Sequence, residues 1–466
     1  PISLDVLQEK YLKIGETSAE DLYRRVARAL ASVEAEGERE KYEALFLANL
    51  HAGAIGAGRI MSAAGTDIQA TLINCFVQPV GDCIQGVDEG GYPGIYEALR
   101  EAAETMRRGG GVGYDFSRIR PRGAQVKGTH SMASGPCSYI NVFDQSCSTV
   151  ESAGARRGAQ MGVLRIDHPD VMEFITAKRT PGRWNNFNVS VGVSDSFIEA
   201  VQNDQPWELV HQSRPGATLL AQGAYQRADG QWVYQTLPAQ TLWDTIMQSA
   251  YDFAEPGILF LDHINTDNNL HYCEEIAATN PCGEQPLPSY GCCDLGPIIL
   301  TRFVRHPFGF SGVQAFDFAA FENSVALQVR ALDNVLDVTF WPLEQQRAEA
   351  HAKRRIGVGF TGMGNTLAML RLRYDTDEGR AMAARIAEHM RDAAYSASVA
   401  LAREKGRFPK FDAEAYLANG TFASRLPEAL QEDIRQHGIR NSHLLSIAPT
   451  GTVSLAFADN ASNGIE

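Results

Sequence analysis

The chain has 466 residues, of which 44% are apolar and 21% charged, and its formal net charge is −14. This composition is ordinary for a globular protein with a large core. The negative charge argues against a protein that binds the phosphate backbone of nucleic acid, although a few local donors can still hold a small phosphorylated ligand.

Other broad classes are disfavoured as well. No apolar run approaches the roughly 18 residues of a membrane span, and the first residues do not read as a secretory leader, so no membrane partner is expected. The eight cysteines, at 75, 83, 137, 147, 273, 282, 292 and 293, are too sparse for a disulfide scaffold and form no CxxC pair. We therefore expect reduced thiols, no structural metal and a cytoplasmic protein.

The pattern of apolar residues predicts a helical start and then an alternation of short strands with helices. This alternation is typical of an α/β architecture. Helices are predicted over residues 19–34, 40–55, 96–108, 242–254, 318–338 and 381–405, and strands over 72–77, 188–193 and 444–447.

Four glycines occupy five positions at 109–113, directly after a predicted helix. Such a stretch lets a ligand approach the backbone closely. A plain helix stop would also use one or two of these glycines. Both interpretations remain open at this point.

The segment Asn280-Pro281-Cys282-Gly283-Glu284 holds an amide, a thiol and a carboxylate within five residues. Pro281 restricts the backbone before the sulfur and Gly283 frees it afterwards, which predicts a tight loop tip rather than a helix or a central strand. A loop of this kind can aim all three side chains at one small object. The alternative is an ordinary turn that contains a buried cysteine.

Two further glycine motifs lie toward the C-terminus. Residues 357–362 fit G-x-G-x-x-G, but the preceding residues do not read as a strand, so packing of helices is favoured over a dinucleotide site. Residues 448–454 follow a predicted strand, and their amides and hydroxyls could cradle a diphosphate at the start of a helix. A simple strand-to-turn junction is the alternative there.

Taken together, these motifs resemble the large catalytic subunit of ribonucleotide reductase. The resemblance covers roughly residues 55–466 and is carried by ordered segments at 73–76, 109–111, 154–162, 280–287, 293–296, 449–452 and 463–466. Residues 58–62 and 113–121 are most similar to the adenosylcobalamin-dependent branch. The resemblance implies a ten-stranded α/β barrel over 59–466, with Cys282 on a central finger loop, after a helical segment at 1–58. It also implies further barrel and a terminal cysteine pair beyond Glu466.

The resemblance assigns a role to each catalytic residue. Cys282 would be a transient thiyl radical that removes the 3′-hydrogen of the substrate ribose. Glu284 would take the 3′-OH proton, and Asn280 would hold the ribose by a hydrogen bond. Cys75 and Cys293 would supply two electrons by closing to a disulfide. Cys293 is preferred to Cys292 because it lies eleven residues after Cys282 and precedes Asp294-Leu295-Gly296, where the family has Cys-Asn-Leu-Gly.

The resemblance also implies the ligands of the protein. The substrate would be a ribonucleotide, expected as the diphosphate. It would lie beside Asn74, Gly110 and Gly111, with its phosphates on Thr450, Gly451, Thr452 and Val453. A deoxynucleoside triphosphate effector would bind near Asp82, Lys127, Arg157 and Gln160. Adenosylcobalamin would be the radical source and a thioredoxin-like protein the reductant, with a homodimer as one assembly that the family allows.

Three alternatives remain. The chain could belong to the form that receives its radical from a separate metal-containing subunit. It could be a nicotinamide-dependent oxidoreductase that uses the glycines at 357–362, or a nucleotide-binding regulator without activity.

Overall fold

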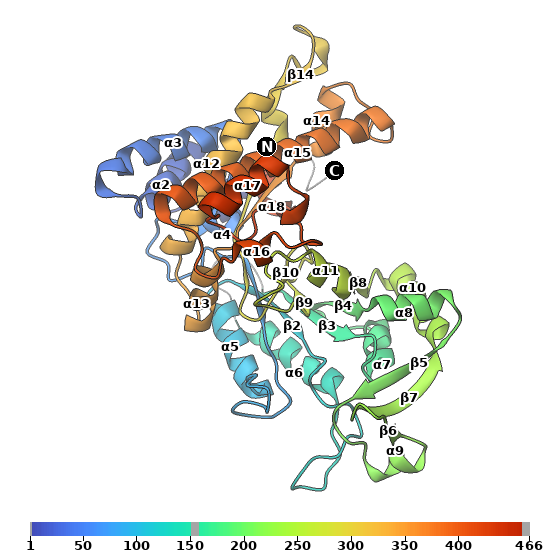
Figure 1. Ribbon diagram of the computed structural model, residues 1–466. Coiled ribbons are helices and arrows are strands. Elements are labelled where there is room, and N and C mark those ends of the chain that lie inside the picture. Colours follow the sequence, from blue (N-terminus) through green and yellow to red (C-terminus); the bar gives the residue numbers. More distant parts are fainter. Residues whose placement is uncertain (1, 151–157, 459–466) are drawn as a thin grey trace. The chain divides into compact units, whose positions relative to one another are not determined.

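The computed structural model describes residues 2–150 and 158–458. Two compact units are present, and the chain passes between them several times. The first unit contains residues 1–74, 267–273 and 292–466, and the second contains 75–266 and 274–291. Both are drawn in Figure 1.

The second unit is built on a parallel sheet in the order β1-β2-β3-β4-β8. Its strands are β1 (Cys75–Gln78), β2 (Gly111–Asp115), β3 (Gln160–Arg165), β4 (Phe187–Val193) and β8 (Gly257–Phe260). The helices that follow or flank them are α5 (Ile95–Arg107), α6 (Pro136–Thr149), α7 (Val171–Thr176), α8 (Asp195–Gln202), α10 (Ala239–Phe253) and α11 (Leu261–Asp267). Strands alternating with helices give the parallel connections expected of an α/β fold.

Two smaller groups of strands complete the second unit. One is an antiparallel sheet in the order β5-β7-β6, with β5 at Pro206–His211, β6 at Tyr225–Gln226, β7 at Trp232–Pro238 and the short helix α9 at Ala217–Ala221 nearby in sequence. The other is the hairpin of β9 (Ala278–Thr279) and β10 (Pro286–Leu287). This hairpin carries the segment that contains Cys282.

The two faces of the parallel sheet are covered differently. Side chains alternate along each strand, so one face of the sheet points into an apolar core that it shares with the helices. This face carries Val112 and Tyr114 of β2 and Val189 and Val191 of β4. The opposite face of β2 carries Gly111, Gly113 and Asp115 instead. Small residues on this face leave room for the β9–β10 hairpin.

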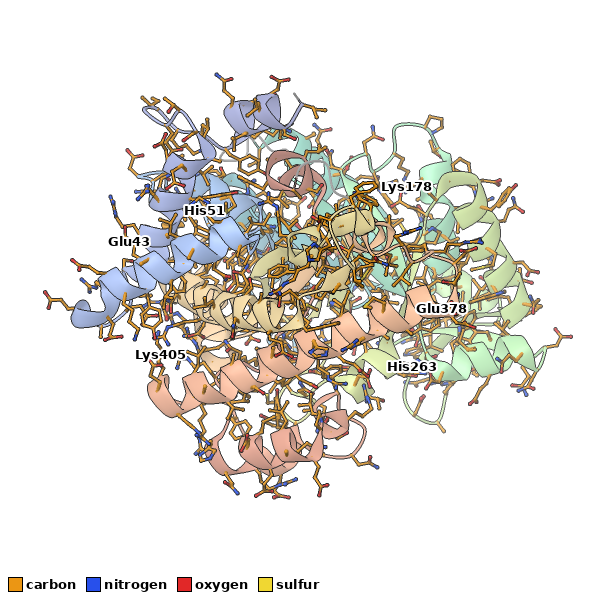
Figure 2. The ribbon with its side chains drawn as sticks, turned by 90° about the horizontal axis from the view of Figure 1, so that it is seen from above. Glu43, His51, Lys178, His263, Glu378 and Lys405 are labelled. Carbon is orange, nitrogen blue, oxygen red and sulfur yellow. The ribbon has the colours of Figure 1, made fainter. Side chains whose placement is uncertain are left out.

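The first unit is mainly helical. Its helices are α1 (Ile2–Lys10), α2 (Ala19–Ala31), α3 (Arg39–Ala52), α4 (Gly58–Ala63), α12 (Phe318–Val338), α13 (Glu344–Lys353), α14 (Met363–Met369), α15 (Asp377–Lys405), α16 (Ala413–Tyr416), α17 (Glu428–His437) and α18 (Gly451–Phe457). Short 3₁₀ turns occur at 36–38, 177–179, 300–303, 307–309 and 423–425 across the two units. Figure 2 shows α15 along its length, with Glu378 near its start and Lys405 at its end.

Local sequence explains where the main helices begin. The Ser18 hydroxyl accepts from Asp21 N and the Asp21 carboxylate accepts from Ser18 N, which forms a capping box at α2. At the starts of α12 and α15, the side-chain oxygens of Asp317 and Thr376 accept from backbone N–H groups. Helices α12 and α15 pack against each other, and α12 also packs on α2 and α3.

A buried ion cluster ties this helical layer together. Arg330 of α12 donates to both oxygens of Glu34 at 2.7 Å and to both oxygens of Glu404. Burial alone would raise the pKa of Glu34, but the hydrogen bonds from Arg330 and Asn334 lower that pKa to about 2. The cluster is therefore ionised at neutral pH and joins three segments that are distant in sequence.

The first unit also contains strands β11 (Cys292–Cys293), β12 (Leu295–Ile299), β13 (Val304–Arg305), β14 (Ala315–Phe316) and β15 (Gly357–Thr361). Strands β12 and β15 run parallel, and Leu445 forms a parallel bridge to Val358 of β15. Strands β13 and β14 form a short antiparallel hairpin.

The glycine motif at 357–362 corrects one expectation. These residues do not pack helix on helix, because 357–361 form the buried strand β15. A Cβ on Gly359 would lie 2.1 Å from the Ser446 carbonyl oxygen, so glycine is needed for the close approach of the neighbouring segment. A dinucleotide fingerprint places its glycines after a strand, whereas these lie within one. The nicotinamide alternative loses its structural basis.

Most of the predicted elements are confirmed. The helix predicted at 318–338 is α12 with the same bounds, and the strand predicted at 188–193 is β4, which begins one residue earlier. The strand predicted at 72–77 begins only at Cys75, and the helix predicted from 381 begins at Asp377. The mixed α/β fold class is confirmed. The domain boundary at residue 58 stays a prediction.

No helix in the described ranges 2–150 and 158–458 is both long and apolar enough to cross a membrane.

Candidate active site

The loop between β9 and β10 is held in a defined turn by Asn280. Its Oδ1 accepts from Gln285 N at 2.9 Å, and its own backbone N–H donates to Gln285 O at 3.2 Å. Gly283 N donates to Asn280 O at 3.0 Å, and Gly283 has a φ of 84°, which favours glycine. The prediction of a loop tip around Cys282 is confirmed.

The loop lies against the glycine face of β2. A Cβ on Gly113 would lie 1.8 Å from Thr279 O, so the backbone of β2 and the stem of the hairpin are in direct contact. A Cβ on Gly111 would lie 3.0 Å from Pro281 Cγ and 3.6 Å from Cys75 Sγ. The Cys75 thiol and the ring of Pro281, the residue before Cys282, therefore face the same point on β2.

The loop presents three different chemical groups. The Cys282 side chain is exposed, whereas Asn280 is fully buried and Glu284 is partly buried. Burial raises the pKa of Glu284, and the nearby Asn280 amide opposes this only in part. A carboxyl with a raised pKa is better matched to taking a proton near neutral pH.

The Asn280 amide nitrogen is a free donor. Its oxygen is engaged by the turn, but Nδ2 is buried with no hydrogen-bond partner in the described part of the chain. The Asn280 side chain lowers the pKa of Glu284, so the amide and the carboxyl are neighbours. Because an unpaired buried donor is costly, Nδ2 is suited to a ligand oxygen.

The remaining predicted catalytic residue, Cys293, and the predicted substrate-binding residue Asn74 lie in the first unit. Cys293 and Cys292 form the two-residue strand β11 and both are buried. Asn74 Oδ1 accepts from Arg59 N at 3.4 Å. The roles of Cys293 and Asn74 stay predictions, as does the pairing of Cys293 with Cys75.

The two adjacent cysteines have different surroundings. Burial raises the pKa of the Cys292 thiol, and the Asp294 carboxyl adds to the effect. Because side chains alternate along an extended segment, Cys292 and Asp294 point to one side and Cys293 to the other. Both thiols are buried, so burial does not separate them, and the interpretation of Cys292 as a bystander stays a prediction.

Asp294, where the resemblance implies an asparagine, lies in surroundings that disfavour its charged form. It is fully buried, and neither carboxyl oxygen has a hydrogen-bond partner among the described residues. Burial raises the pKa of Asp294 well above its usual value, and nearby Asp333 raises it further. Asp333 stays ionised because it pairs with Arg354 and Arg440. A protonated Asp294 resembles the uncharged amide.

We expect Asp294→Asn to remove a pH dependence of stability. The folded pKa of Asp294 is raised, so its contribution is fully present below the unfolded value of 3.8 and is lost as pH rises toward the folded value. Wild type should lose up to about 1.4 kcal/mol per pH unit in that window relative to the variant. Urea unfolding at pH 4.5 and 7.5 measures this. A difference between the two proteins that does not grow with pH contradicts it.

The predicted phosphate turn leads directly into a helix. Thr450 has a φ of 53° and is the residue before α18, which begins at Gly451. The Thr450 hydroxyl bonds to Thr361 Oγ1 at 3.0 Å, and a Cβ on Gly451 would meet nothing within 4 Å. The first amides of α18, at residues 451–453, have no partners within the helix. Amides at a helix start are suited to phosphate, but the assignment stays a prediction.

The predicted effector residues differ in their burial and in their hydrogen-bond partners. Asp82 is nearly buried, pairs with Arg120 and accepts from Ser213 Oγ. Lys127 is exposed and lies 3.9 Å from Glu89. Gln160 is buried, accepting from Tyr114 Oη and donating to Phe143 O, so it is committed to the core. Arg157 lies outside the described residues. All four assignments stay predictions.

Gly110 and Gly111 face different neighbours. A Cβ on Gly110 would meet the Phe76 ring at 2.7 Å, on the helix side of the sheet, whereas Gly111 faces the loop. Packing alone therefore explains both glycines. Their contact with substrate stays a prediction.

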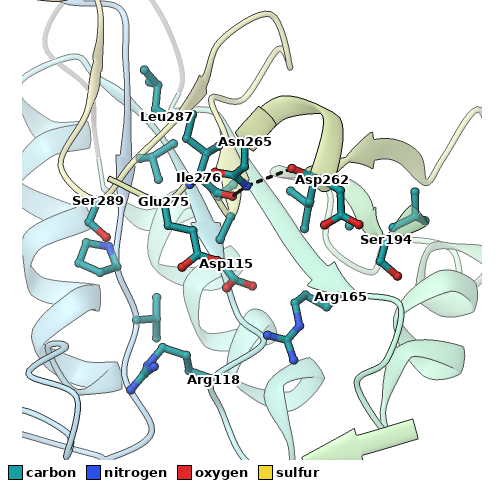
Figure 3. A pocket seen from close by; sticks show the side chains of 18 of the residues that line it. Asp115, Arg118, Arg165, Ser194, Asp262, Asn265, Glu275, Ile276, Leu287 and Ser289 are labelled. Carbon is teal, nitrogen blue, oxygen red and sulfur yellow. Dashed lines mark hydrogen bonds between the residues drawn. The ribbon is translucent and has the colours of Figure 1, made fainter. Parts of the chain in front are cut away.

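A cavity of about 360 Å³ was not foreseen from the sequence. It lies where β1 to β4 end, beside the stem of the β9–β10 hairpin. Figure 3 shows Asp115, Glu275 and Arg165 turned toward one another within it, with Arg118 nearby. Ligands of α/β sheets commonly bind at the carboxyl ends of strands, but that rule needs the strand order, which the sequence does not display.

The fold and this loop identify the class of protein. The family description "Ribonucleotide reductase, barrel domain" matches residues 73–466, and "Ribonucleotide reductase, all-alpha domain" matches residues 1–69. The chain belongs to the ribonucleotide reductase family.

Individual curated relatives also match the chain. The chain is 35% identical over 477 residues to the vitamin B12-dependent ribonucleoside-diphosphate reductase of Mycobacterium tuberculosis (strain CDC 1551 / Oshkosh), which covers 100% of this chain and 61% of the relative. It is 35% identical over 393 residues to the protein of the same name from Thermoplasma acidophilum, covering 84% and 45%. The ribonucleoside-diphosphate reductase large chain of Encephalitozoon cuniculi is 27% identical, covering 98% and 60%. The chain thus spans less than two thirds of each relative.

Proposed function

We propose that the protein reduces ribonucleoside diphosphates to 2′-deoxyribonucleotides by radical chemistry, with adenosylcobalamin as the radical source. The observation that carries this proposal is the loop at 280–284. It presents an exposed thiol, a carboxyl with a raised pKa and a free amide donor beside the Cys75 thiol. Family membership supports the reaction type, and the names of the M. tuberculosis and T. acidophilum relatives support the cofactor.

The residues of this chain would divide the reaction as follows. The Cys282 thiyl removes the 3′-hydrogen, Glu284 takes the 3′-OH proton, and Asn280 Nδ2 donates to a ribose oxygen. The 2′-OH leaves as water, and the Cys75 and Cys293 thiols supply two electrons and two protons as they close to a disulfide. Cys282 then returns the hydrogen to C3′. The amides at residues 451–453 would hold the diphosphate.

Among the described residues, Cys282 is exposed and a Cβ on the neighbouring Gly283 would meet nothing within 4 Å, which leaves room beside the sulfur for a radical donor. Adenosylcobalamin, when bound, supplies the radical through its homolysable Co–C bond. We further assign Asp82, Lys127 and Arg157 to the effector site and a thioredoxin-like dithiol protein as reductant, both on the family pattern.

A product assay tests the proposed function. Protein, a ribonucleoside diphosphate, adenosylcobalamin and a chemical dithiol are mixed, and deoxynucleotide is measured by chromatography. We expect product with wild type, none without adenosylcobalamin and none with Cys282→Ser. Product from Cys282→Ser would overturn the proposal. Product that appears only after a separate metal-containing subunit is added would instead establish the alternative radical source.

The cysteine assignment makes its own prediction. In a single turnover without external reductant, Cys293→Ser and Cys75→Ser should each form almost no product, because the dithiol cannot close. Cys292→Ser is the matched control, one residue away and equally buried, and should retain near wild-type yield. Product from Cys293→Ser but not from Cys292→Ser would refute the pairing.

A further inference from the structure

A side chain from the neighbouring sheet reaches the loop that carries Cys282. Asn188 of β4 lies on the face opposite the apolar core, where Val189 and Val191 point the other way. Its Nδ2 donates to Pro281 O at 2.7 Å. That carbonyl belongs to the peptide that leads directly into Cys282. The contact joins residues 93 positions apart in the chain.

Hydrogen bonds from an ion pair hold the backbone of β4 on both sides of Asn188. Lys178 Nζ donates to Phe187 O at 2.5 Å and pairs with Glu255 at 2.5 Å, and Glu255 Oε1 accepts from Val189 N at 2.9 Å. The backbone groups on both sides of Asn188 are thus tied to one ion pair. This ion pair is largely shielded from solvent, with about a fifth of each side chain exposed.

We propose that Asn188 is a positioning residue for the Cys282 thiol, because its amide holds the peptide before the sulfur and the Lys178–Glu255 pair holds the strand from which it reaches. The inference rests on the proposed role of Cys282. Turn contacts of Asn280 set the shape of the loop, but they lie within the loop and do not fix it on the sheet. The Asn188 bond and the packing of Thr279 on Gly113 do.

Two substitutions separate positioning from space filling. Asn188→Ala removes the donor, and Asn188→Asp keeps the shape but offers only acceptor oxygens at neutral pH. Both should lower kcat at least about tenfold, since small misplacements of reacting groups have large effects on rate. KM for the nucleotide should change less than about threefold if the substrate is held elsewhere. Asn186→Ala is the control, because the Asn186 side chain donates to Asp144 O and not to the loop.

A second readout needs no turnover. The rate at which iodoacetamide alkylates Cys282 in the resting protein is compared, by mass spectrometry, with that of the exposed Cys273 in the same sample. We expect Asn188→Ala to change the Cys282 rate at least about threefold and to leave the Cys273 rate unchanged, since only the loop loses its tether. Asn186→Ala should change neither rate.

The outcomes are distinct. A changed Cys282 rate together with lower kcat in both Asn188 variants supports the proposal. An unchanged Cys282 rate, an unchanged kcat, or full activity in Asn188→Asp overturns it. If wild type makes no deoxynucleotide, the proposed function fails. The alkylation rates then still decide whether Asn188 holds the loop.

Discussion

Gly113→Ala is expected to lower the rate of nucleotide reduction at least about 100-fold. The added Cβ would lie 1.8 Å from Thr279 O, and both sides of this contact are backbone, so neither can turn away as a side chain could. The hairpin stem must therefore move, and Cys282, Asn280 and Glu284 move with it. The measurement is kcat for deoxynucleotide formation with adenosylcobalamin.

Two other glycines serve as controls, because an added Cβ would be less crowded at each of them than at Gly113. Gly111→Ala should have a smaller effect, because its Cβ would lie 3.0 Å from Pro281 Cγ, a contact that a small shift relieves. Gly37→Ala should leave activity near wild type, since nothing lies within 4 Å of its Cβ position. Equal activity of Gly113→Ala and Gly37→Ala would mean that the hairpin does not rest on β2 in the active enzyme.

Glu284→Gln is expected to lower kcat by about 100- to 10,000-fold, the usual contribution of a general base. Burial raises the pKa of Glu284, so the carboxylate form grows as pH rises through a value above the ordinary 4.5. Wild-type kcat should therefore rise with pH through that value. The residual activity of Glu284→Gln should not show this rise with pH. The pH profiles of the two proteins measure the effect.

Stability distinguishes this loss of chemistry from damage to the fold. Because the folded pKa of Glu284 is raised, its contribution to stability is full below the unfolded pKa and is lost as pH rises through the folded pKa. The uncharged glutamine avoids that loss, so the variant should be at least as stable as wild type at pH 7.5. A variant that is both inactive and clearly less stable would contradict the assignment of Glu284 as base.

The catalytic loop could be predicted from its own residues. Proline before and glycine after Cys282 restrict the backbone locally, and the observed turn with φ of 84° at Gly283 follows from that restriction. Helix α12 could also be predicted from the sequence, because its apolar residues repeat with helical spacing over 21 residues. Sequence patterns are sufficient where the conformation depends only on residues that are close in the chain.

The glycine motif at 357–362 shows where local rules fail. Its spacing indicates a loop or a helix contact, yet Gly357–Thr361 form a buried strand whose glycines admit the segment at 444–447. The reason for glycine is a neighbour some ninety residues later in the chain. No pattern within the motif encodes that neighbour.

Asn188 and the cavity beside Asp115 were missed for the same reason. A polar residue at one position of β4 is unremarkable in sequence, and only the folded sheet brings it to Pro281 O. The cavity needs the ends of four strands to meet. Asp82 and Gln160 were chosen by resemblance, and the structure adds that both already have internal partners.

The central claim is that the Cys282 sulfur carries the radical. Protein made with cysteine deuterated at Cβ is mixed with adenosylcobalamin, a ribonucleoside diphosphate and a deoxynucleoside triphosphate, frozen within milliseconds and measured by electron paramagnetic resonance. We predict a radical signal that narrows on deuteration and is absent in Cys282→Ser but present in Cys292→Ser. A signal of unchanged width, or one that persists in Cys282→Ser, would contradict the account.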